Sequence, residues 1–155
     1  DITASSMDDL IIQSNFTPTD AMNHMLLHGT SIFPNLLSKQ TAEAARDYIL
    51  ERNQVEERFW VINNENRYSF GIGVNAHPAI QKALQELYQN KMLRKSLDKI
   101  VGPNPAVIEF TAITSTAGAK NQPFHQDVVP TGSAFKYARN FVPSYSLFIP
   151  LQHVT

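Results

Sequence analysis

The stretch that decides the fold of this chain is GPNPAVIEFTAIT, residues 102–114. Its first four residues include two prolines and a glycine, which end a preceding helix because proline lacks an amide donor and fixes φ. The residues that follow are β-rich, with Val107, Phe110 and Ile113 among β-branched neighbours, and they predict a strand from about residue 106. The stretch therefore divides a helical part from a strand-forming part.

Upstream, residues 1–16 lack a clean period and are expected to form an irregular lead-in. Thr17 is the predicted N-cap of a helix, with Pro18 in its first turn and Asp20 at the capping-box position. Gly29 is the predicted C-terminal stop, because glycine readily takes the left-handed conformation that ends a helix.

The spacing of apolar residues predicts two more helical regions further along the chain. Ser38 is expected to open a second helix that stops near Asn53, and Pro78 a third, whose pattern continues or restarts as far as Ile100. Strands are expected at 58–62 and 68–74, on either side of a turn cluster of Asn and Glu.

A last strand is expected at 144–151, where Pro150 indicates an edge or a bulge. Helices first and strands later indicate an α+β domain, with a β-barrel or sandwich beginning near residue 106. At 155 residues and 43% hydrophobic residues, the chain fits one domain with a packed core, here residues 17–155.

The composition narrows the function classes. A net charge of −1 gives no electrostatic footprint for nucleic acid, and the scattered lysines and arginines do not indicate an anionic membrane surface. No apolar run is long enough for a transmembrane helix. The absence of cysteine excludes disulfides and thiolate chemistry. No protein partner is inferred, and we expect a soluble, intracellular protein.

The chemistry-bearing motif is His125-Gln126-Asp127, in a turn-rich stretch after the predicted strand. A His and an Asp two apart on an extended backbone project to the same side. Imidazole and carboxylate make up two-thirds of the facial triad that holds non-haem Fe(II). His125 and Asp127 are therefore the predicted metal ligands, while Lys120 and Arg139 flank them and could meet an anionic substrate or cosubstrate.

The other histidines are assigned structural roles. His24 and His28 are four apart on a helix but lack the glutamate of a zincin motif, so we interpret them as helix-surface residues. His77 precedes Pro78 at a helix boundary, and His153 ends the last predicted strand.

Three ordered segments resemble the phytanoyl-CoA dioxygenase family of Fe(II)/2-oxoglutarate-dependent oxygenases. They are the lead-in at 28–38 with the helix that contains residues 45–49, the segment 121–127 with its His-Gln-Asp, and the strand at 145–155. The resemblance spans roughly residues 22–155.

This resemblance implies helices packed on a double-stranded β-helix, or jelly roll. It implies Fe(II) on His125 and Asp127, 2-oxoglutarate as cosubstrate, and hydroxylation of a small organic substrate by O2 with release of succinate and CO2. Because the acidic ligand Asp127 is retained, hydroxylation is favoured over halogenation. Gln126 and Gln122 would lie near the substrate, and Phe148 and Lys120 near the cosubstrate.

The family's third iron ligand and its 2-oxoglutarate-binding arginine are expected downstream of Thr155. The chain is thus interpreted as the N-terminal part of a longer oxygenase, with an incomplete jelly roll that is inactive by itself. Two alternatives stay open: a non-catalytic jelly-roll binding module, and a cupin-like zinc or manganese protein.

Overall fold

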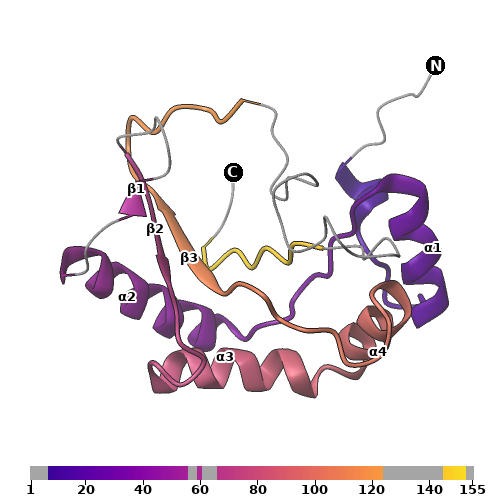
Figure 1. Cartoon of the computed structure of the whole chain (residues 1–155). Coiled ribbons are helices and arrows are strands. Elements are labelled where there is room, and N and C mark those ends of the chain that lie inside the picture. The colour runs from indigo at the N-terminus through magenta and orange to yellow at the C-terminus, as the bar shows by residue number, and fades with distance from the viewer. Residues whose placement is uncertain (1–6, 56–58, 61–65, 124–144, 153–155) are drawn as a thin grey trace, which may run out of the picture.

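The computed structural model describes residues 7–55, 59–60, 66–123 and 145–152 (Figure 1). In chain order the elements are η1 (Met7–Leu10), α1 (Pro18–His28), α2 (Lys39–Val55), β1 (Phe59–Trp60), β2 (Arg67–Gly71), α3 (Pro78–Gln89), α4 (Lys91–Ile100) and β3 (Thr111–Ser115). The three strands form an antiparallel sheet in the order β1-β2-β3. The described part therefore contains helices and one small antiparallel sheet.

The prediction of a double-stranded β-helix was wrong for these residues, which form four α-helices and one small antiparallel sheet. The strand expected from residue 106 begins only at Thr111. Its neighbour β2 ends at Gly71, and one further bond joins the Ile72 amide to the Phe110 carbonyl before the chain turns away at Gly73. Residues 106–109 thus have β propensity, but none of the strands that the structure describes pairs with them.

The prediction of a strand at 144–151 was also wrong for the described residues 145–152, which belong to no sheet. Leu147 and Phe148 are exposed, while Leu151 packs against the core. Apolar and aromatic side chains favour a strand, but a strand forms only where a second one offers backbone partners.

The predicted boundaries of α1 are confirmed. Thr17 and Asp20 form a capping box, in which the Asp20 amide donates to Thr17 Oγ1 at 3.2 Å and the Thr17 amide donates to Asp20 Oδ2 at 2.8 Å. The Thr17 hydroxyl also donates to Asp20 Oδ2 at 2.7 Å. The hydroxyl and the amide of Thr17 lower the pKa of the Asp20 carboxyl, with the hydroxyl as the largest cause. Gly29 ends the helix with φ of 73°, a conformation that glycine adopts at little cost.

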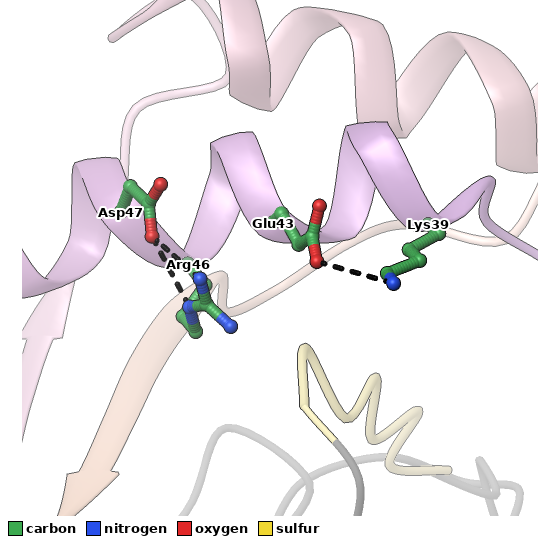
Figure 2. A network of polar contacts seen from close by, with 4 residues as sticks. All are labelled: Lys39, Glu43, Arg46 and Asp47. Atoms are coloured by element: carbon green, nitrogen blue, oxygen red, sulfur yellow. Dashed lines mark hydrogen bonds and ion pairs between the residues drawn. The ribbon is translucent and has the colours of Figure 1, made fainter.

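A carboxylate on α3 fastens the beginning of α2. Glu86 accepts hydrogen bonds from the Ser38 amide at 2.8 Å, from Ser38 Oγ at 3.1 Å and from the buried Thr41 hydroxyl at 2.6 Å. These donors lower the pKa of the Glu86 carboxyl, Thr41 being the largest cause. The far side of α2 carries exposed ion pairs, Lys39 with Glu43 and Arg46 with Asp47 (Figure 2).

The helix α2 continues past its predicted stop at Asn53 and ends at Val55. Asn53 Nδ2 instead donates to Thr114 Oγ1 on β3 at 2.6 Å. Between this bond and the Glu86 contacts lies the apolar core, which joins α2, α3 and one face of the sheet; its buried members are Ala45, Phe70, Ile72, Ile80 and Ala112.

Candidate functional site

The two faces of the sheet differ in what covers them. Phe70 and Ala112 are register partners, and both are buried in the core with α2 and α3. Tyr68 and Thr114, the next partners on that side, follow the same alternation, and Thr114 receives the bond from Asn53. This side of β2 and β3 is therefore occupied by packing against the helices.

The opposite side of β2 and β3 carries mostly small or polar residues, and we call it the open face. Its side chains are exposed or partly exposed, and Ile113 keeps 56% of its surface accessible. The face consists of Arg67, Ser69 and Gly71 on β2, and Thr111, Ile113 and Ser115 on β3. An exposed sheet face with little side-chain bulk offers a platform on which a ligand can lie.

One basic side chain is held on the open face. Arg67 and Ser115 are directly opposite each other in the register, and Arg67 Nε donates to Ser115 Oγ at 3.1 Å. This bond uses one of the five guanidinium N–H donors. Arg67 forms no ion pair within the described ranges.

The segment that leads toward the predicted metal ligands leaves the sheet at the same end. The Thr116 amide donates to the Asn66 carbonyl at 2.8 Å, and a turn closes with a bond from the Ala119 amide to the Thr116 carbonyl at 3.0 Å. Gly118 has φ of 87°, and a Cβ there would lie 2.9 Å from Asn66 Nδ2. The start of this segment is thus fixed against the residue that precedes Arg67.

The predicted site residues fall partly outside the described ranges. His125, Gln126, Asp127 and Arg139 lie in residues 124–144, and their roles stay predictions. Lys120 and Gln122 are exposed in the irregular segment after β3.

Phe148 is 71% exposed in the segment 145–152. Because His125 and Asp127 lie outside the described residues, the roles assigned to Phe148, Lys120 and Gln122 beside the metal stay predictions.

The described histidines take structural positions. His24 Nε2 donates to the Asp9 carbonyl at 2.6 Å, and its Nδ1 lies 3.0 Å from Ser31 Oγ, so this side chain joins η1 to the segment after α1. Its ring centroid is 4.5 Å from that of His28. His77 Nδ1 accepts from the Ala79 amide and caps α3, while its ring stacks on Tyr48 at 4.4 Å. His153 lies outside the described residues.

No group of three His, Cys, Asp or Glu suited to a metal occurs among residues 7–55, 59–60, 66–123 and 145–152. The described part also holds no helix whose length and apolar character would let it cross a bilayer.

The sequence reasoning missed Arg67 and Ser115. The alternation of Arg67, Ser69 and Gly71 was a usable signal that these residues share one face, but only the register with β3 shows that Ser115 lies opposite Arg67.

Comparison of the chain with protein-family models, with curated proteins and with solved structures gives no match. The resemblance to the phytanoyl-CoA dioxygenase family therefore rests on the quoted sequence segments alone.

Proposed function

We propose that this chain provides two metal ligands of an Fe(II)- and 2-oxoglutarate-dependent dioxygenase that hydroxylates a small organic substrate. The observation that carries the proposal is the triplet His125-Gln126-Asp127, which follows β3 in the sequence after a turn-rich stretch. The proposal rests on this motif and its neighbouring segments, and it requires no particular arrangement of further strands.

The donor set of the triplet suits the metal. A neutral imidazole and a carboxylate are two members of the set that holds non-haem Fe(II), and the negative charge of Asp127 lowers the cost of holding a dication. When bound, the iron would supply oxygen activation coupled to decarboxylation of 2-oxoglutarate. A third ligand is needed in addition to His125 and Asp127.

The described residues support the site by holding the start of the segment that carries it. The Thr116 amide is bonded to the Asn66 carbonyl, and β3 is bonded to β2 and, through Asn53, to α2. A catalytic loop held by a rigid scaffold keeps its ligands near the productive geometry, which is what a hydroxylase needs. Lys120, exposed on this segment, offers an ammonium to an anionic cosubstrate.

The test is succinate formation from 2-oxoglutarate, measured with Fe(II) on the longest available form of the protein. We expect succinate to form and Asp127→Ala to abolish it, because a dication loses its charged ligand. The matched control is Asp47→Ala, which removes an exposed carboxylate on α2 that pairs, among the described residues, with the neighbouring Arg46. Equal activity in Asp127→Ala and the control would refute the proposal.

Metal analysis separates the remaining candidates. A cupin-like protein would retain zinc or manganese through His125 and Asp127 and would not respond to 2-oxoglutarate. A non-catalytic binding module would retain no metal, and Asp127→Ala would leave its ligand binding unchanged.

A further inference from the structure

We infer that the substrate of the proposed oxygenase is an organic acid, and that Arg67 on the open face holds its anionic group. This inference rests on the proposed function, and it deepens that proposal by naming the class of substrate. Arg67 would act as a residue that positions the substrate and sets its specificity. It would take no part in the oxidation itself.

Arg67 is oriented by a neutral partner. Its Nε donates to Ser115 Oγ, which fixes the plane of the guanidinium without neutralising its charge. The terminal nitrogens retain four N–H donors in a fork that matches the two oxygens of a carboxylate. An arginine whose role was only to stabilise the sheet would gain more from an acidic cross-strand partner than from a serine.

Glu109, the acidic residue that precedes β3, lies far from Arg67. Glu109 accepts a hydrogen bond from Thr111 Oγ1 at 3.3 Å, so its carboxylate lies at the opposite end of β3. Ser115 lies six residue steps beyond Glu109 along the extended chain, a distance of about 20 Å. Glu109 is too far away to pair with Arg67, so among the described residues the cation stays available to a ligand.

Small and exposed residues lie beside Arg67 on the open face. Ser69 and Ile113 are register partners one step of two residues from the pair Arg67 and Ser115, about 7 Å along the strands. Ile113 is 56% exposed, and the next position on this face is Gly71 opposite Thr111. A ligand with its anionic group at Arg67 would lay an apolar body of several carbons over Ile113 and Gly71.

Arg67 and Ser115 stand at the end of β2 and β3 from which the chain continues to His125 and Asp127, and Asn66 fixes the start of that segment. An anion held here would have its carbon skeleton anchored on the scaffold that carries the ligands. Such anchoring through a group remote from the reacting carbon is how binding energy supports positioning.

The test is binding of simple probes by the full chain without metal, followed by amide chemical shifts in NMR titrations. The probes are hexanoate, hexyl phosphate and the uncharged hexanamide. We expect hexanoate to shift the Gly71, Ile113 and Ser115 amides and to bind at least about tenfold more tightly than hexanamide, because a charge-assisted bidentate pair is formed only with the acid. Tighter binding of hexyl phosphate would identify the anion as a phosphate ester.

The decisive variant is Arg67→Gln, expected to weaken hexanoate binding about tenfold or more and to leave hexanamide binding unchanged. Arg67→Lys keeps the charge but loses the forked guanidinium, so its affinity for hexanoate should lie between those of the wild type and Arg67→Gln. Ser115→Ala should weaken hexanoate binding by a smaller factor than Arg67→Gln does. Arg46→Gln, on the exposed side of α2, is the matched control and should bind as the wild type does. Hexanoate binding that is absent, or equal in Arg67→Gln and the wild type, would overturn the inference.

Succinate formation and hexanoate binding test the oxygenase and the Arg67 site separately. Arg67-dependent hexanoate binding without any succinate formation would overturn the oxygenase and leave an organic-acid binding site. Succinate formation that requires Asp127, together with hexanoate binding that ignores Arg67, would overturn the inference and retain the oxygenase. A thermal unfolding curve of Arg67→Gln that matches the wild type shows that the loss of binding is local.

Discussion

Replacing Glu86 with alanine should destabilise the protein more than replacing any exposed glutamate on α2. The carboxylate of Glu86 accepts three hydrogen bonds at the beginning of α2, from the Ser38 amide, the Ser38 hydroxyl and the Thr41 hydroxyl. Thr41 is buried, so its hydroxyl would lose its charged acceptor where water cannot fully replace it.

The magnitude follows from these contacts. A hydrogen bond to a charged group contributes roughly 1.5–3 kcal/mol, and a carboxylate near a helix N-terminus adds about 0.3–1 kcal/mol. Glu86 is only partly buried, so water competes for its oxygens and the lower end applies. We expect Glu86→Ala to lower the free energy of unfolding by about 2 kcal/mol, which lowers Tm by about 4–8 °C in a domain of this size.

The assay is urea unfolding of Glu86→Ala beside the matched control Glu43→Ala. Glu43 lies on the exposed side of α2, 3.9 Å from Lys39, and an exposed pair of this kind contributes less than about 1 kcal/mol (Figure 2). The Glu86 variant should show a lower midpoint with an unchanged slope. Equal midpoints for the two variants would refute the view that Glu86 fastens α2 to α3.

The contribution of Glu86 should also depend on pH. Its donors lower the pKa of the carboxyl in the folded protein, with Thr41 as the largest cause. A group with a lowered folded-state pKa stabilises fully above its unfolded-state pKa, and loses this stabilisation as pH falls through the folded-state value. The difference between wild type and Glu86→Ala should therefore be constant from pH 7 to about pH 5 and should shrink at lower pH.

Two further substitutions test local features of the fold. Thr17→Ala removes the N-cap hydroxyl of α1 and should lower the free energy of unfolding in urea by about 1 kcal/mol. Thr19→Ala, at the second residue of the helix, should lower it by less. Gly118→Ala puts an L side chain at φ of 87°, so the strained backbone should destabilise the protein by about 1 kcal/mol or more in urea unfolding. A Gly118 variant as stable as the wild type would show that this turn does not hold residue 118 in the left-handed conformation.

The features that were predicted correctly are those that neighbouring residues specify. The start of α1 depends on Thr17, Pro18 and Asp20, and its end depends on Gly29, all within one or two turns of the helix. The same holds for Pro78 at the start of α3. Capping and the φ preferences of proline and glycine act over a few residues, so the sequence contains the whole signal.

The features that were wrong depend on partners far along the chain. Residues 106–109 and 145–151 have the composition of strands, but whether a ladder forms depends on where β2 ends and on what lies beside each segment. Asparagine is a residue type that often ends a helix, but the side-chain amide of Asn53 donates to Thr114 on β3 and the helix continues to Val55. Arg67 and Ser115 meet only through the register of two strands that are distant in sequence.

The helix α2 is bonded at its beginning to α3 by Glu86 and near its end to β3 by Asn53. Because α2 is bonded at both ends, we expect α2, α3 and β3 to move together when any one of them is displaced. The amides near both ends of α2 should then exchange with deuterium slowly in the free and the loaded protein alike.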